Sequence, residues 1–263
     1  MNLLTSPAAT LAKRAALVLT VAAASTAAHA LPTFGFDPNA AGLNGAAFTA
    51  DNLIISNFST VTFTSATTFT DTGFFSISAA QLGGAGFTPS GLNSSYGLYV
   101  AFSGSGTTNG TNPVAAPTFG SFSSLTYTLY GYNGSASFGF SGNTPTTTAA
   151  APVALASGSL VQGSAVTVPN GDGTFTPFGN AKLTVNVLQP AFFASPAAFY
   201  DTALSAFSNT SSQVEVFANG FRIRQGGGSI NFASAVPEPE SYAMLLAGVA
   251  VLGFVARRRR VQH

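Results

Sequence analysis

The side chains that could carry out acid–base or nucleophilic chemistry are few in this chain of 263 residues. It has no cysteine, and its two histidines are His29 and His263. We find no nucleophile elbow in a suitable setting and no phosphate-binding glycine loop. Paired carboxylates, as in glycoside hydrolysis, would have to come from acids far apart in the sequence: Asp37, Asp51, Asp71, Asp172, Asp201 and Glu215. We therefore expect binding rather than catalysis, without a cofactor or metal, and a secreted carbohydrate-active enzyme stays the alternative.

One short segment resembles part of a calcium-binding loop. Asn170-Gly171-Asp172-Gly173 places oxygen ligands close together, but the later ligands of an EF-hand are missing. The segment is better explained as a plain turn.

The charge distribution separates the two ends of the chain from its middle. Charged residues make up 6% of the sequence, against about 25% in an average globular protein. Between residues 31 and 235, three basic residues (Lys182, Arg222, Arg224) stand against six acidic ones, a formal net charge of −3. This middle part has no basic face for nucleic acid, which we exclude as a partner.

Residues 1–30 have the pattern of a secretory signal peptide. Lys13 and Arg14 precede an apolar run, and the small-residue site Ala28-His29-Ala30 follows. We expect cleavage after Ala30, so that Leu31 becomes the first residue of the exported chain. Without cysteine, the exported protein must be stabilised by packing rather than by disulfides.

Residues 236–260 have the pattern of a second targeting signal. An extended motif at 236–241 contains Val236, Pro237, Glu238 and Pro239, and an apolar helix is expected at 242–256. Fifteen helical residues span only about 22 Å, which is marginal for a membrane core of about 30 Å. The closing cluster of Arg257, Arg258, Arg259 and Arg260 should stay in the cytoplasm. A temporary anchor and a permanently anchored surface protein both fit this pattern.

These three parts, in this order, resemble the PEP-CTERM sorting signal. The resemblance implies recognition of Pro237, Glu238 and Pro239 by an exosortase, a membrane enzyme that passes proteins to the cell surface. It also implies a Gram-negative bacterium that makes extracellular polysaccharide, and a transient stay in the inner membrane. The signal itself does not say what residues 31–235 do.

The middle part, 31–235, is predicted to be all-β. Apolar residues alternate with threonine or other polar residues, for example at Leu125, Tyr127 and Leu129. We expect an antiparallel β-sandwich or jelly roll. Long polar loops are expected at 103–124 and 141–158, and an amphipathic helix at 196–207.

The clearest predicted hairpin surrounds Asn219-Gly220, a dipeptide favoured in type I′ turns. That turn would pair Val216 with Ile223 and Glu215 with Arg224, which we interpret as a register-setting ion pair. Arg222 and Arg224 are also candidate ligand contacts.

Two further candidate contacts flank Gly131, where the apolar alternation changes phase. Tyr130 and Tyr132 are expected to be exposed there and able to stack on sugar rings.

A broader resemblance covers the first half of the middle part. The segments Leu31 to Phe34, Phe48 to Asn52, Phe69 to Phe74 and Tyr96 to Gly104 are similar to flocculation-associated PEP-CTERM proteins. The resemblance implies a matrix or cell-surface protein that promotes flocculation or biofilm cohesion by binding exopolysaccharide or itself. It supplies no catalytic residue.

Overall fold

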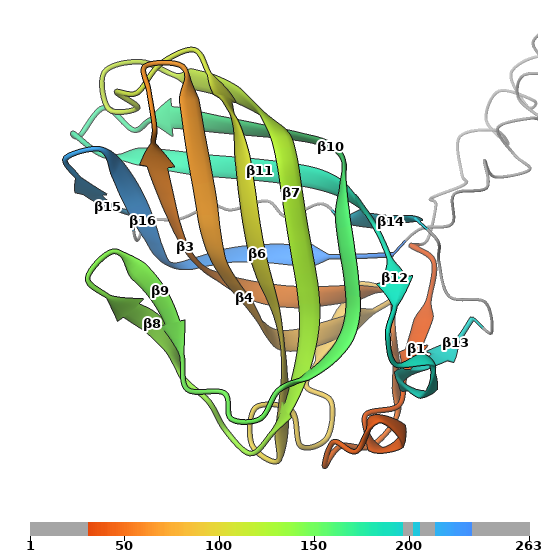
Figure 1. Cartoon of the computed structure of the whole chain (residues 1–263). Coiled ribbons are helices and arrows are strands. Elements are labelled where there is room, and N and C mark those ends of the chain that lie inside the picture. The colour runs from red at the N-terminus through yellow and green to blue at the C-terminus, as the bar shows by residue number, and fades with distance from the viewer. Residues whose placement is uncertain (1–30, 197–201, 206–213, 233–263) are drawn as a thin grey trace, which may run out of the picture. The chain divides into compact units, whose positions relative to one another are not determined.

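The computed structural model describes residues 31–196, 202–205 and 214–232. All of these except Leu31 belong to the compact unit that begins at Pro32. The described residues form sixteen strands and two short 3-10 helices (Figure 1). In chain order they are β1 (Phe34–Phe36), η1 (Asn39–Ala41), β2 (Phe48–Ala50), β3 (Asn52–Phe63), β4 (Thr68–Leu82), β5 (Ala85–Phe87), β6 (Tyr96–Thr108), β7 (Thr118–Asn133), β8 (Phe138–Ser141), β9 (Thr144–Thr147), β10 (Val153–Pro169), β11 (Phe175–Thr184), β12 (Asn186–Val187), η2 (Pro190–Phe192), β13 (Phe193–Ser195), β14 (Thr202–Ser205), β15 (Val214–Phe217) and β16 (Gly220–Ile230).

Eleven of the strands form one sheet. Its order is β14-β11-β10-β7-β6-β4-β3-β16-β15, with β5 added beside β4 and β12 beside β10. All the strand pairs in this sheet are antiparallel. The predicted antiparallel all-β class is therefore confirmed. The predicted sandwich or jelly roll is wrong, because these strands hydrogen-bond into a single sheet instead of two facing sheets.

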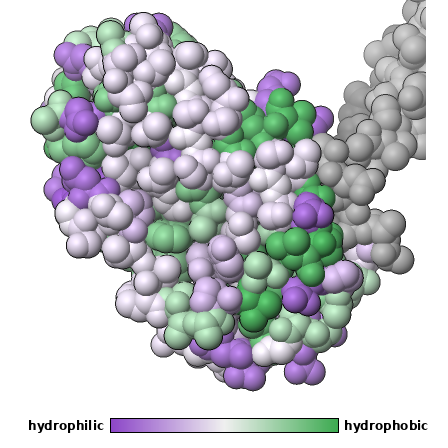
Figure 2. All heavy atoms as spheres, in the orientation of Figure 1, coloured by the Kyte–Doolittle hydropathy of each residue, from purple (hydrophilic) through white to green (hydrophobic). Residues whose placement is uncertain are grey.

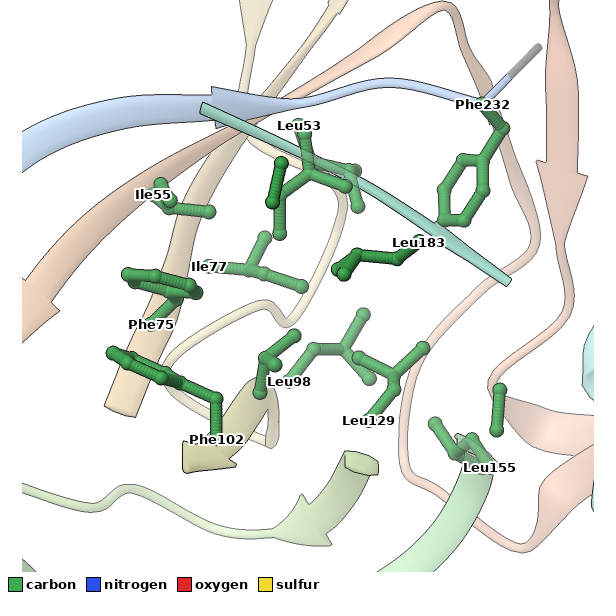
Figure 3. Packing of buried hydrophobic residues seen from close by; sticks show 14 of the residues in the cluster. Leu53, Ile55, Phe75, Ile77, Leu98, Phe102, Leu129, Leu155, Leu183 and Phe232 are labelled. Carbon is green, nitrogen blue, oxygen red and sulfur yellow. The ribbon is translucent and has the colours of Figure 1, made fainter. Parts of the chain in front are cut away.

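The main sheet curls so that its apolar face covers itself. Five of its strand pairs contain a bulge or register shift, and bulges bend and twist a strand. Every long strand sends side chains into the enclosed core, as Figure 3 shows for Leu53 of β3, Ile77 of β4, Leu129 of β7 and Leu183 of β11. We call this the inner face, and the opposite one the outer face.

Aromatic contacts close the curl. Phe221 on β16 packs edge-on against Phe175 on β11, with ring centroids 5.0 Å apart, although the two strands lie near opposite ends of the sheet order. A smaller sheet of β13, β1 and β2 adds Phe34 and Phe36, both fully buried, and Phe34 packs edge-on against Phe232. Such edge-to-face pairs stabilise a core beyond the area they bury.

The two long polar loops predicted at 103–124 and 141–158 are mostly strand. β6 continues to Thr108, β7 begins at Thr118, and β10 begins at Val153. Most serines and threonines of these strands lie on the outer face and alternate with residues that point to the inner face. On the outer face they pair across neighbouring strands, as in the 2.9 Å hydrogen bond between the hydroxyls of Ser105 and Ser124. The prediction was wrong because hydroxyl-rich outer faces have the same composition as loops.

The predicted helix at 196–207 falls largely outside the described residues. Where the structure does describe it, Thr202–Ser205 is strand β14, which pairs with β11. The helix prediction is thus wrong for these four residues, because the edge of β11 offers hydrogen bonds to an extended segment.

A carboxyl group lies inside the curled sheet. Asp71 on β4 points to the inner face with 7% of its surface exposed. Burial raises the pKa of Asp71 from 3.8 to about 7, and the hydroxyl of Ser59 offsets this effect only in part. The core thus holds a carboxyl group that favours its neutral form.

This burial predicts an unusual pH dependence of stability. Between pH 4 and 7 the unfolded chain releases the Asp71 proton while the folded chain keeps it, so stability falls as pH rises. The loss is up to about 1.4 kcal/mol per pH unit, or about 4 kcal/mol in all. Urea unfolding of Asp71→Asn between pH 5.5 and 8 should lack this contribution. The exposed control Asp172→Asn should keep it, and equal slopes in both variants would contradict the assignment.

Candidate functional site

The β8–β9 hairpin lies on the outer face of the main sheet. The Thr60 hydroxyl on β3 donates a 2.5 Å hydrogen bond to the carbonyl oxygen of Asn143 in the hairpin turn. The Phe138 ring of β8 stacks on Phe58 of β3, with centroids 5.8 Å apart. The hairpin and the sheet together define one edge of a surface groove.

Aromatic rings continue from the hairpin across four strands. Phe138 lies 6.1 Å from Phe74 of β4 and 5.5 Å from Tyr99 of β6, and Tyr99 stacks on Tyr130 of β7 at 5.2 Å. We call Phe58, Phe74, Tyr99, Tyr130 and Phe138 the outer aromatic row. Burial, together with its tyrosine neighbours, raises the pKa of Tyr99 to about 12, so its hydroxyl is neutral at physiological pH.

Arg222 fastens the hairpin to the end of the sheet. Its guanidinium forms a two-bond ion pair with Glu215 on β15, one bond being 3.0 Å from Nε to Oε2. It also donates to the carbonyl oxygen of Gly142 and lies 5.6 Å from the centre of the Phe140 ring. The hydrogen bonds from Arg222 lower the pKa of Glu215 below its usual value. A two-stranded hairpin alone is only marginally stable, so these contacts position β8 and β9.

Arg224 belongs to the same cluster but remains available to solvent. Its Nε lies 2.6 Å from Oε2 of Glu215, and 52% of its side chain is exposed, against 13% for Arg222. Gln225 follows at a bulge of β16 with a φ of 153°, which residues with side chains rarely adopt. Bulges often direct a side chain toward a site.

These groups surround an open groove with a volume of about 530 Å³. We call it the outer groove. Its lining residues are Phe58, Phe138, Gly139, Phe140, Gly142, Arg222, Arg224 and Gln225. Aromatic rings next to guanidinium and amide donors can bind a ligand that has both apolar faces and oxygen acceptors.

The structure separates the four predicted ligand contacts. Arg222 and Arg224 both line the outer groove. Tyr130 is half-buried within the outer aromatic row. Tyr132 is 1% exposed, so its predicted exposure is wrong. Its ring packs over Gly97, which has no side chain to occupy that space. A Cβ added at Gly97 would be 2.2 Å from the tyrosine hydroxyl.

The hairpin of β15 and β16 forms with a different register from the predicted one. Glu215 pairs with Arg222, and Val216 with Phe221, across a two-residue turn of Ala218 and Asn219. Neither turn residue has a positive φ, which a type I′ turn requires. Gly220 is needed for another reason, because a Cβ there would lie 2.0 Å from the carbonyl oxygen of Val61 on β3.

Sequence reasoning missed the aromatic part of the groove. Phe58, Phe138 and Phe140 were not among the predicted ligand contacts, although all three line the groove. The alternation Phe138-Gly139-Phe140 was the available signal. It indicated a strand with a single aromatic face, but not which part of the sheet that face would meet.

The acids that the structure describes are held in different parts of the fold. Asp37 accepts a hydrogen bond from the backbone of Ala40 beside η1, and Asp51 accepts one from Gly83. Asp172 accepts bonds from Thr174 and forms the turn between β10 and β11, as expected for a plain turn. Among these described residues, no cluster of three or more metal-ligating side chains occurs.

Comparison with known proteins adds a finding at the C-terminal end. The family model of the PEP-CTERM protein-sorting motif matches residues 235–260. The chain carries a PEP-CTERM sorting motif. The motif implies processing by an exosortase and a location at the cell surface or outside the cell. No curated protein and no solved structure matches the chain.

The residues of both predicted targeting signals lie outside the described part of the chain. This applies to Ala28 and Ala30 of the signal peptide and to the PEP-CTERM residues from Val236 to Arg260, including the apolar helix expected at 242–256. Leu31 is described and is 42% exposed. Within 31–196, 202–205 and 214–232, no helix has the length and hydropathy needed to cross a bilayer.

Arg222 should control the docking of the hairpin. Arg222→Ala removes the ion pair, the bond to Gly142 and the contact with Phe140, so amide hydrogen exchange should become faster at 138–147. Arg224→Ala is the matched control and should leave this exchange unchanged. Unchanged exchange in Arg222→Ala would show that the Thr60 hydrogen bond and the aromatic contacts with the sheet are sufficient to hold the hairpin.

Proposed function

We propose that this PEP-CTERM protein is a component of the extracellular matrix or cell surface that promotes flocculation or biofilm cohesion by binding exopolysaccharide. The sorting motif supports the destination. The resemblance of the first half of the middle part to flocculation-associated PEP-CTERM proteins supports the process. The outer groove is the proposed binding site.

The observation that carries this proposal is the composition of the outer groove. Phe58, Phe138 and Phe140 provide rings, and Arg224 and Gln225 provide donors beside them. A sugar ring has apolar C–H faces and a rim of hydroxyl groups, so it can stack on a phenyl ring while its oxygens accept hydrogen bonds. Arginine also suits sugars that carry carboxylates, because its planar fork matches their two oxygens.

The surface outside the groove has the composition expected of a protein located in a polysaccharide matrix. Figure 2 shows a face on which most residues are pale, that is, neither strongly hydrophilic nor strongly hydrophobic. Hydroxyl groups pair with one another along the outer face, as in Thr107 with Ser121 at 3.2 Å. With few charges, little long-range repulsion separates this surface from neighbouring molecules.

Self-association is a second mode of cohesion with an observation of its own. Among the described strands, β15 pairs with β16 alone and ends the main sheet. Its Val216 is 60% exposed. An edge strand with an exposed apolar residue can pair with the edge of another copy.

Binding rather than turnover is part of the proposal. The described acids serve separate local roles, and the outer groove contains no acid among its lining residues. Retention of residues 242–256 as a permanent membrane anchor would leave this binding mode unchanged.

The groove makes a direct prediction about polysaccharide binding. Phe140→Ala and Arg224→Ala should each weaken binding by about tenfold, because each removes one central contact. The measurement is co-sedimentation of the purified protein with exopolysaccharide from the cells that produce it.

A phenylalanine outside the groove provides the control. Phe119 of β7 is 58% exposed and does not line the groove. Phe119→Ala should bind as the unmodified protein does, and an equal loss in all three variants would contradict a groove-specific site. Release of new reducing sugar ends during the assay would favour the alternative of a carbohydrate-active enzyme.

A further inference from the structure

A cavity lies on the inner face of the curled sheet, separate from the outer groove. Its volume is about 60 Å³, and a single water needs roughly 10–15 Å³. The space therefore exceeds what one water fills and is sufficient for a short organic molecule. We call it the inner pocket.

The floor of the inner pocket is polar and has unused hydrogen-bonding capacity. Asp71 and Asn57 line it with 7% and 3% of their surfaces exposed. Asp71 Oδ1 and Asn57 Oδ1 are buried without a hydrogen-bond partner in the described structure. The other buried polar pair in the lining, Thr118 and Thr167, is satisfied internally at 2.6 Å. Ser59 Oγ, whose hydroxyl lies near enough to Asp71 to lower its pKa, is also buried without a hydrogen-bond partner. Buried polar groups without partners are rare and costly, and one hydroxyl cannot satisfy both Oδ1 acceptors, so this group can take a further donor.

The walls of the inner pocket are aromatic and aliphatic. Phe69 and Phe122 pack edge-on with centroids 5.5 Å apart, and Phe221 and Ile223 close the side formed by β16. Asp71 is the one charged side chain among the lining residues. A carboxylate enclosed by phenyl rings attracts a cation through both its charge and the faces of the rings.

We propose that the inner pocket binds a small primary ammonium compound with a short apolar tail. The ammonium group donates to Asp71 Oδ1 and Asn57 Oδ1, and the tail lies against Phe69, Phe122 and Phe221. A primary ammonium carries a single charge, which one carboxylate balances, and two of its three N–H donors are directed to Asp71 Oδ1 and Asn57 Oδ1. The proposal does not depend on polysaccharide binding, because the two sites share no lining residue.

The test compares n-butylammonium with butan-1-ol, which has a tail of the same length and no charge. NMR titration of the full chain at pH 8 should show n-butylammonium binding at least about tenfold more tightly, as expected for a charge-assisted hydrogen bond. Binding should weaken at pH 5.5, where Asp71 is largely neutral.

Variants make the assignment specific. Asp71→Asn should lose the preference for n-butylammonium while its urea midpoint shows that it folds, and Asp172→Asn should keep the preference. A second variant, Asn57→Leu, should weaken the binding of n-butylammonium, because it removes one acceptor and fills part of the pocket. Equal affinity for the two probes, a preserved preference in Asp71→Asn, or no shift of pocket resonances with either probe would overturn the proposal. The last result would mean that solvent alone fills the space.

Discussion

One constraint organises this fold: an eleven-stranded sheet has a single apolar face, and among the described residues only the small sheet of β13, β1 and β2 adds to its cover. The face must therefore largely cover itself, and the sheet curls (Figure 1). The curl brings Phe221 of β16 against Phe175 of β11. Bulges in successive strand pairs provide the bend, and close packing against Val61 requires glycine at 220. Burial of apolar area at about 25 cal/mol per Å² stabilises the curled form, and a chain without cysteine has no disulfide to assist it.

The same curl creates two different environments for binding. The inner face is enclosed, so a single carboxyl group there, Asp71, acquires an unusual pKa of about 7. The outer face is convex and largely open to solvent. The short β8–β9 hairpin packs on its aromatic row, and a groove lies beside the hairpin. Arg222 holds the hairpin beside that groove, and the more exposed Arg224 is the arginine that we propose contacts a ligand. The division follows from burial, since both arginines contact the same carboxylate of Glu215.

Sequence patterns predicted the local structure better than the global one. The alternation of Leu125, Tyr127 and Leu129 correctly predicted part of β7, because a half-buried strand must alternate. The number of sheets was not predictable in this way, because a curled sheet and a sandwich bury the same alternate residues. The arginines of the groove were identified from the hairpin predicted around Asn219-Gly220, whereas Phe138 was missed because its partner Phe58 is 80 residues away in the sequence. The sorting signal was recognisable because its three parts follow one another within a short stretch of sequence. The family match at 235–260 confirms the PEP-CTERM motif.

The central claim is that this exported protein holds cells together through its outer groove. The most direct measurement is the settling rate of cells that lack the gene, complemented either with the full sequence or with a Phe140→Ala/Arg224→Ala double variant that is exported at the same level. The account predicts dispersed cells after deletion, flocs with the full sequence, and poor settling with the double variant. Settling that is unchanged by deletion, while the cells still secrete polysaccharide, would contradict it.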